Sequence, residues 1–187
     1  VVPKADAVRN EERALDVTQG KLVLGFRTGC TLTDAEFPAL LMMNAIYGGG
    51  ITSKLFMKVR EELSLCYYAS STLEKFKGVM LVSSGIDCAQ RDIAQAEILR
   101  QLDAVRAGDI SDYEFESARR YLRSSLSTGM DSPGRLDDFY IGQLIAGQPD
   151  TMQALSERIA RVTKDDVAAA ARRVSLDTVF FLKGVQA

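Results

Sequence analysis

Histidine is absent from the 187 residues of this chain. Serine and cysteine nucleophiles usually depend on a histidine base, and catalytic zinc sites usually bind the metal through histidine together with carboxylate or cysteine. The absence of histidine therefore argues against Ser–His or Cys–His catalysis and against an ordinary catalytic zinc site. We expect the chain alone to hold no metal, no cofactor and no catalytic residue.

Cysteine, long hydrophobic runs and unbalanced charge are also scarce. The three cysteines, Cys30, Cys66 and Cys88, are widely spaced, which indicates neither a disulfide framework nor a zinc knuckle and suits a reducing compartment. No apolar stretch approaches the roughly 20 residues that span a bilayer. The net charge of −2 comes without a basic run. We therefore expect a cytoplasmic domain that binds neither a membrane nor nucleic acid.

The residues that are present have the proportions of one folded domain. Hydrophobic residues make up 47% of the chain and charged residues 26%, which is typical of a globular domain with a real core. Residues 21–187 are predicted to form this domain, and residues 1–20 a linker or a strand extension from a missing N-terminal half. The sequence opens Val-Val-Pro without an initiator methionine, so we expect a piece of a longer protein.

Hydrophobic periodicity predicts a strand, two helices, a hairpin, a block of helices and a closing strand. Predicted strands are 21–27, 66–73, 79–86 and 178–182, and predicted helices are 39–47, 55–63, 90–106, 111–128, 136–145, 151–161 and 163–174. Thr33 with Glu36, and Ser111 with Glu114, have the spacing of capping boxes. The order predicts an α+β fold of two layers, with helices on one face of a mainly antiparallel sheet.

The chain is organised around Gly48–Tyr68, GGGITSKLFMKVREELSLCYY. Three glycines allow positive φ and the close approach of another segment. The helix that follows has Leu55, Val59 and Leu63 on its expected buried stripe. The spacing does not match a phosphate-binding P-loop, because no glycine precedes the lysine and a helix, not a strand, precedes the glycines.

Two polar side chains of this segment are candidates for binding. Arg60 is expected beside Phe56 on the short helix, and Tyr67 follows near the start of the next strand. An arginine and a tyrosine presented in this way bind peptide carbonyls or a developing oxyanion. The alternative is a surface arginine and a half-buried tyrosine. In a regular strand, Tyr67 and Tyr68 point to opposite sides.

The pattern GGGxxSxLFxxxRExLxLxY resembles the glycine-rich segment and the Arg/Tyr pair in the C-terminal half of the pitrilysin/insulinase metallopeptidases. These inverzincins take their name from an H-x-x-E-H zinc motif. Residues 78–87, 115–147 and 162–184 are similar to further segments of that family in the same order. One departure is Cys66, which stands where the family usually has glycine or alanine.

This resemblance implies a domain like those of the mitochondrial processing peptidase, and a bacterial protein in which two halves close around a peptide. Arg60 and Tyr67 would bind the peptide or protein substrate, with Gly48, Gly49 and Gly50 as the glycine-rich loop. Zinc, its water and the general base would come from the N-terminal half, as a fused or separate partner, and a dimer is possible. The chain would serve a zinc-dependent peptidase without being active alone.

Two alternatives remain open at this point. Some family members lack the zinc motif throughout and act as structural or partner subunits, as the core proteins of respiratory complexes do. A free-standing ligand-binding module is the third interpretation. The presence of H-x-x-E-H in the missing upstream sequence distinguishes the first two.

Overall fold

The computed structural model describes residues 2–184, whose strands form one five-stranded sheet in the order β1-β5-β2-β4-β3. The strands are β1 Arg9–Leu15, β2 Gly20–Arg27, β3 Tyr68–Glu74, β4 Val79–Ile86 and β5 Ser175–Gly184. The β1–β5 pair is parallel and the three other pairs are antiparallel. The expectation of a mainly antiparallel sheet is confirmed, and the parallel edge pair makes the sheet mixed.

The helices fall where periodicity predicts them, within a few residues at each end. They are α1 Phe37–Tyr47, η1 Leu55–Glu62, η2 Cys88–Gln90, α2 Arg91–Ala107, α3 Asp112–Met130, α4 Pro133–Ala146, α5 Met152–Arg161 and α6 Lys164–Arg173. The short helix η1 is a π-helix in which Leu55 and Val59 are buried. Leu63, predicted on the same stripe, is 44% exposed, and it lies just beyond the end of η1 as its C-cap residue.

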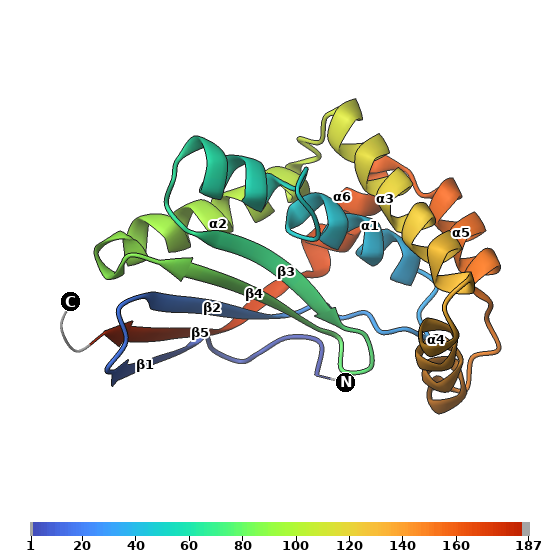
Figure 1. Ribbon diagram of the computed structural model, residues 1–187, viewed down its shortest axis with the longest axis horizontal. Helices are drawn as coiled ribbons and strands as arrows, with labels where there is room; N and C mark the ends of the chain where they lie inside the picture. Colours follow the sequence, from blue (N-terminus) through green and yellow to red (C-terminus); the bar gives the residue numbers. More distant parts are fainter. Residues whose placement is uncertain (1, 185–187) are drawn as a thin grey trace.

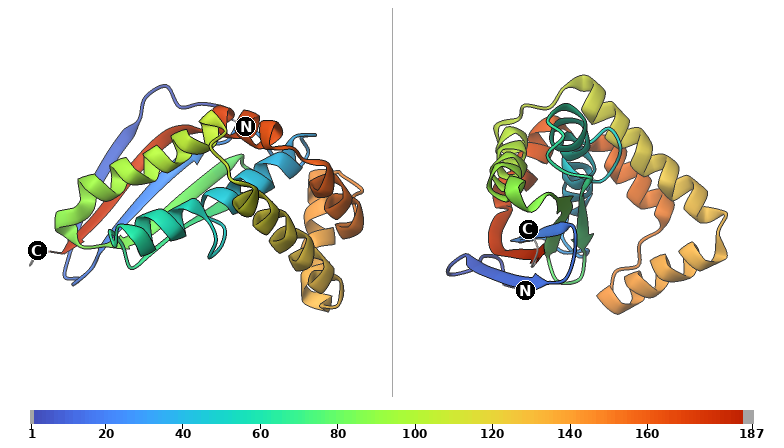
Figure 2. Two further views of the ribbon diagram at one scale, coloured as in Figure 1. Left: turned by 90° about the horizontal axis from the view of Figure 1, so that it is seen from above. Right: turned by 60° about the vertical axis from the view of Figure 1, so that its left-hand side comes forward.

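The two layers are visible from above in Figure 2, where the helices lie over one face of the sheet. Alternation explains this arrangement: Leu22, Leu24 and Phe26 of β2 point into the core, and the residues between them do not. Within residues 2–184 no helix lies on the opposite face, where Tyr68 and Leu81 are exposed. The predicted two-layer α+β fold is confirmed.

Strand β5 is an interior strand, as its continuous hydrophobicity predicts, and it holds β1 at the sheet edge (Figure 1). Every residue of β1 is exposed, so burial contributes little to its position. Asp177 of β5 accepts a hydrogen bond from Arg27 at 2.6 Å and one from Arg9 at 3.1 Å. Hydrogen bonds from Thr178 and Arg27 hold the pKa of Asp177 well below its usual range. Residues 9–15 are thus a paired strand, not a linker.

The start of α3 was predicted correctly, whereas α4 begins at Pro133, before the predicted residue 136, and the predicted start of α1 was wrong. The capping box of Ser111 and Glu114 is present at the start of α3. At α1 the predicted box of Thr33 with Glu36 is absent, because the helix begins only at Phe37. The carboxylate of Asp34 instead accepts hydrogen bonds from the backbone and side chain of Thr31 in a turn before the helix.

Helix α3 extends beyond the sheet, and α4 folds back from its end as an arm, which Figure 2 shows clearly in its right-hand view. The chain turns at Asp131 and Ser132, and Pro133 occupies the first turn of α4, where its missing N–H is not needed. Gly147 ends α4 at a φ of 67°, a left-handed conformation that favours glycine.

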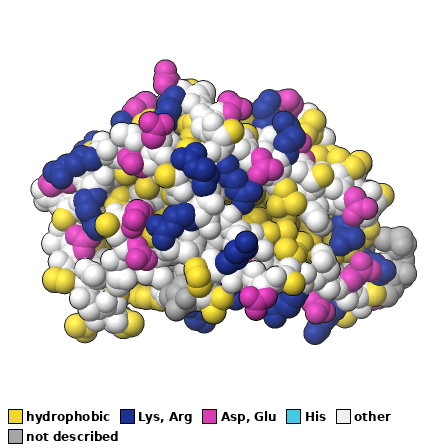
Figure 3. Space-filling view, turned by 180° about the vertical axis from the view of Figure 1, so that it is seen from behind, with side chains coloured by type: hydrophobic (Ala, Val, Ile, Leu, Met, Phe, Trp, Pro, Cys, Tyr) yellow, Lys and Arg dark blue, Asp and Glu magenta, His cyan; other side chains and the backbone are white. Residues whose placement is uncertain are grey.

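The back of the molecule, shown in Figure 3, has a mixed surface. Lys and Arg side chains gather in its middle, acidic side chains lie among them and toward the rim, and hydrophobic side chains reach the surface on either side. One hydrophobic area, at the lower left of this view, coincides with the place of α4.

Candidate functional site: the glycine-rich loop and helix η1

The glycine-rich loop is required for close packing against strand β3. The carbonyl of Gly48 accepts a hydrogen bond from the Ser71 N–H at 2.9 Å. A Cβ at Gly48 would lie 2.7 Å from the Ser71 nitrogen and 2.8 Å from a methyl of Leu55, and one at Gly49 would lie 2.9 Å from the Cα of Ala45. Positive φ, the other use expected of these glycines, is not found at either position. Gly48 and Gly49 therefore serve the close approach of the loop to β3 and to the end of α1.

Gly50 differs from its two neighbours because open space surrounds it. Apart from its own chain neighbours, no atom of the described residues lies within 4 Å of the position that its Cβ would take. Gly50, Ile51 and Thr52 form one wall of a groove of about 770 Å³, and the facing side of α3, including Arg120 and Tyr121, forms the other. The loop therefore carries an accessible groove at its tip, while its base is packed.

The start of η1 is fixed by buried polar contacts that the sequence did not predict. Ser53 is fully buried, and its hydroxyl accepts a hydrogen bond from the Phe56 N–H at 3.3 Å. Lys54, 7% exposed, forms an ion pair of 2.9 Å with Glu114 of the α3 capping box. Burial raises the pKa of Glu114, but hydrogen bonds from Lys54 and Ser111 outweigh it and hold this pKa below its ordinary value of 4.5.

The Lys54–Glu114 pair joins the glycine-rich segment to the helical block. A buried charge is costly without a partner, so each of these two residues depends on the other. The sequence offers one clue, since the capping box of Ser111 and Glu114 was recognisable. The lysine partner could not be recognised in the sequence, because Lys54 and Glu114 are 60 positions apart in the chain.

Arg60 lies on Phe56, as predicted, with its guanidinium carbon 4.7 Å from the ring centroid. Its side chain is 41% exposed, and its Nε is 3.6 Å from a carboxylate oxygen of Glu61. Stacking on an aromatic ring orients the guanidinium and leaves its N–H donors at the ring's rim. Arg60 is thus oriented and still accessible.

A tight turn leads from η1 to β3 and determines where Tyr67 lies. Ser64 has a φ of 50°, and the N–H of Leu65 donates to the carbonyl of Val59 at 2.9 Å. The N–H of Tyr67 then donates to the carbonyl of Gly85 at 2.8 Å. Because Gly85 is also the register partner of Tyr68, two residues face one residue of β4, which is the geometry of a β-bulge.

Tyr67 lies outside β3, which begins at Tyr68, so the alternation expected of the two tyrosines in a regular strand does not apply to it. Both tyrosines are accessible, Tyr67 being 68% exposed and Tyr68 39%. Tyr68 lies over Gly85, where a Cβ would come within 2.5 Å of its ring. Tyr67 therefore stands free at the start of the sheet edge and is not half-buried in a strand.

Cys66 lies between the two candidate residues and is buried. Burial raises the pKa of its thiol to about 11, against the opposing effect of the nearby Arg60 charge. The thiol is consequently protonated near neutral pH and has little nucleophilic character.

The chemistry of this site is that of hydrogen-bond donation. Arg60 offers guanidinium N–H groups and Tyr67 a phenolic O–H, both at the surface.

Residues 2–184 contain no group of three or more His, Cys, Asp or Glu side chains placed to hold a metal ion. They also contain no helix that combines the length and hydrophobicity of a bilayer span.

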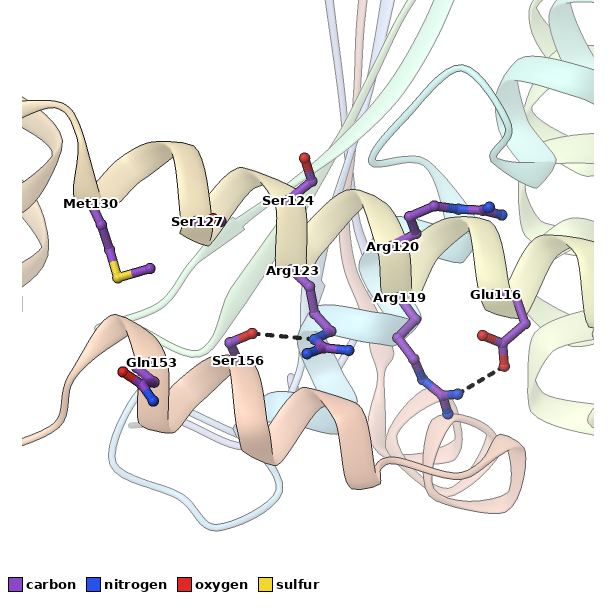
Figure 4. A pocket seen from close by; sticks show the side chains of 9 residues that line it. All are labelled: Glu116, Arg119, Arg120, Arg123, Ser124, Ser127, Met130, Gln153 and Ser156. Atoms are coloured by element: carbon purple, nitrogen blue, oxygen red, sulfur yellow. Dashed lines mark hydrogen bonds and ion pairs between the residues drawn. The ribbon is translucent and has the colours of Figure 1, made fainter.

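A second groove, shown in Figure 4, lies between α3 and α5 and has a volume of about 630 Å³. Two of its arginines, Arg119 and Arg123, are engaged within the protein. Arg119 donates to Glu116 and to the carbonyl of Val162, each at 2.8 Å, and Arg123 donates to the hydroxyl of Ser156 at 3.3 Å. In Figure 4, Arg120 points away from the α5 wall. These donors do not converge on one point, so the groove lacks the geometry of an anion site.

Comparison with known families identifies the domain type. A family model described as "Peptidase M16 inactive domain" matches residues 2–122. The chain is 38% identical over 171 residues to a "Probable inactive metalloprotease YmfF" of Bacillus subtilis, which covers 91% of this chain and 40% of that protein. It is 33% identical over 178 residues to an "Uncharacterized zinc protease SCO5738" of Streptomyces coelicolor, covering 90% of this chain and 38% of that protein.

Solved structures agree with this assignment. A conserved protein from Enterococcus faecalis superposes with a TM-score of 0.92 at 32% identity, over 99% of this chain and 44% of the other. A protease from Helicobacter pylori superposes with a TM-score of 0.85 at 18% identity, over 97% of this chain and 45% of that one, which supports the fold alone. The chain thus spans less than half the length of these relatives.

Proposed function

The chain belongs to the M16 peptidase family, whose inactive domain it matches, and we propose that it is the substrate-binding half of a bacterial zinc peptidase. In this proposal a second half, fused or separate, carries the zinc and closes over the side formed by the glycine-rich loop, η1 and Tyr67. The protein would act on peptide or protein substrates in the cytoplasm. The reaction served is hydrolysis of a peptide bond.

One observation carries the proposal: the two exposed donors are held by a fixed backbone. The Lys54–Glu114 pair and the Gly48 carbonyl anchor one end of the segment, and the hydrogen bond between Tyr67 and Gly85 anchors the other. Groups that bind a transition state work best when their position is set beforehand.

Each residue has a distinct role in the proposal. Arg60, oriented by Phe56, donates hydrogen bonds to a peptide carbonyl or to the oxyanion that develops from it. Tyr67 donates its O–H to the same substrate from the sheet edge. The groove beside Gly50 accepts a substrate side chain, because the loop has no Cβ there.

The residues of this chain do not fit a zinc ion. Histidine is absent, and several candidate carboxylates, such as Glu114 and Asp177, are paired with lysine or arginine. In the proposal, the zinc, its water and the general base therefore belong to the other half.

A second function is favoured by the name of one similar protein. The Bacillus subtilis relative is described as a probable inactive metalloprotease, so a proteolytically inactive member that acts as a structural or partner subunit is the alternative. The sequence of the remaining part of the protein separates the two, because an active member requires H-x-x-E-H there.

Variants of the longer protein test the proposal. Arg60→Ala and Tyr67→Phe should each lower kcat/KM by roughly 100-fold, which is typical for loss of one oxyanion donor. Tyr113→Phe is the matched control, because Tyr113 has the same 68% exposure as Tyr67 but lies on α3. Melting temperatures measured on the same samples separate catalysis from folding.

Full turnover in both variants of an otherwise active protein would show that the pair has no role in binding. A loss of activity that follows a matching loss of thermal stability would assign Arg60 and Tyr67 a structural role instead. If the longer protein lacks peptidase activity and the zinc motif, the alternative function holds.

A further inference from the structure

Helix α4 is apolar on two opposite sides, and only one of them is packed. On the inner side, Phe139 and Ala146 pack against the core. Gly142 is buried beneath the tip of the β3–β4 hairpin, where a Cβ would lie 3.0 Å from the Lys75 amino group and 3.5 Å from the Phe76 ring. This inner side alone explains why α4 folds back onto the domain.

The outer side of α4 exposes four large hydrophobic residues, which we call the α4 stripe. Their exposed fractions are 46% for Tyr140, 55% for Ile141, 81% for Leu144 and 71% for Ile145. The spacing of i, i+1, i+4 and i+5 places them along one face of the helix. A helix that is apolar on both sides is normally covered on both sides. An exposed cluster of this kind marks an interaction surface.

A groove beside the stripe adds an independent observation. It has a volume of about 520 Å³ and is lined by Tyr140, Leu144 and the connection to α5. Gln143, which also lines it, is only 3% exposed, and its amide oxygen is buried without a hydrogen-bond donor among the described residues. A buried acceptor without a partner destabilises the folded state. The surroundings of α4 are therefore incomplete in polar as well as in apolar contacts.

We propose that the α4 stripe is an interface with the part of the same protein that this chain does not include. The chain covers only 40% of one relative and 44% of one solved structure, so more than half of such a protein is available as the occupant. The position of α4 supports this choice. Helix η1 packs against β3, and α4 packs on the tip of the β3–β4 hairpin, so one body along the β3 edge reaches both.

The interface rests on the length of the relatives and on the exposure of α4, and it requires neither zinc nor the Arg60–Tyr67 pair. The α4 interface would be a second contact between the two halves, in addition to the closure over the glycine-rich loop. It lies at the hairpin-tip end of the β3 edge, whereas η1 lies toward the other end. A bound peptide substrate would not be the occupant of the α4 stripe, because the remaining half is present whether or not substrate is bound.

The test compares the longer protein with the 187-residue chain by hydrogen exchange and thermal unfolding. Amides of residues 138–146 should exchange about tenfold or more slowly in the longer protein than in the chain. The double substitution Leu144→Ser and Ile145→Ser should lower the melting temperature of the longer protein by about 3 °C or more and leave that of the chain unchanged. Ile93→Ser, at a residue 58% exposed on α2, is the control and should affect neither.

Equal exchange of residues 138–146 in both proteins would overturn the proposal. Analytical ultracentrifugation of the chain tests whether a second copy of the chain occupies the stripe instead. A dimer that the double substitution converts to a monomer would assign the stripe to a second copy and would also overturn the proposal. Protection of α4 without protection of residues 48–68 would support this interface and contradict the closure over the glycine-rich loop.

Discussion

The Gly48–Tyr67 segment and helix α4 both expose hydrophobic side chains, but the two regions are held in opposite ways. In the first, Ile51 is 74% exposed and Tyr67 68%, yet buried polar contacts fix the backbone beneath them. In the second, Leu144 is 81% exposed, and the neighbouring Gln143 has a buried amide oxygen to which none of residues 2–184 donates a hydrogen bond.

Exposed apolar residues therefore occur in two different structural situations in this domain. Where the supporting backbone is anchored, exposed groups are presented in a fixed position, which suits the binding of a small or extended ligand. Where the support is incomplete, exposure indicates that a further part of the protein is needed. In our proposals the first region binds a peptide, and the second makes a permanent contact.

The largest effect that tests this comparison is expected at Lys54. Lys54→Met leaves Glu114 charged and partly buried, and should lower the free energy of unfolding of the chain by about 2–3 kcal/mol. Lys58→Met is the control, because Lys58 pairs with Glu62 on the surface and should cost less than about 0.5 kcal/mol. Urea unfolding at neutral pH measures both. Equal effects would show that the segment is not anchored by this pair.

The same pair predicts a pH dependence. Because the pKa of Glu114 is lowered on folding, the pair stabilises the chain above the unfolded pKa and loses this contribution as pH falls through the lower folded pKa. The stability difference between the wild type and Lys54→Met should therefore shrink below about pH 4. A difference that is constant from pH 7 to pH 3 would contradict this account.

A smaller effect is expected in the glycine-rich loop, where two neighbouring substitutions should have opposite results. Gly48→Ala brings a methyl within 2.7 Å of the Ser71 nitrogen and should destabilise the chain by about 1–3 kcal/mol. Gly50→Ala meets open space at a φ that is not positive, so it should be neutral or stabilise by about 0.5 kcal/mol. Thermal unfolding of both variants decides. A large loss for Gly50→Ala would mean that the tip is as packed as the base.

The smallest effect is a ranking of local stability within the 187-residue chain. Hydrogen exchange should be about tenfold or more faster for residues 138–146 than for residues 59–65, since α4 has only one packed side. No substitution is needed, so the native protein is its own control. Slower exchange in α4 than in η1 would remove the basis of the comparison.

Periodicity and spacing in the sequence predicted the layers and the helices, and the resemblance of the GGGxxSxLFxxxRExLxLxY segment indicated the family. The alternation of Leu22, Leu24 and Phe26 predicted β2 and its buried face, and the capping box of Ser111 and Glu114 predicted the start of α3. Arg60 beside Phe56 was predictable for the same reason. These features depend on residues a few positions apart, whose geometry the local backbone sets.

The tertiary structure alone decided the features that join distant segments. Lys54 pairs with Glu114 across the fold, and Gly85 of β4 accepts the hydrogen bond of the Tyr67 N–H and is the register partner of Tyr68. The apolar residues of α4 were visible in the sequence, but their pattern does not say which side is packed. Contacts between segments far apart in the chain depend on how the layers come together, and no local pattern of residues encodes that.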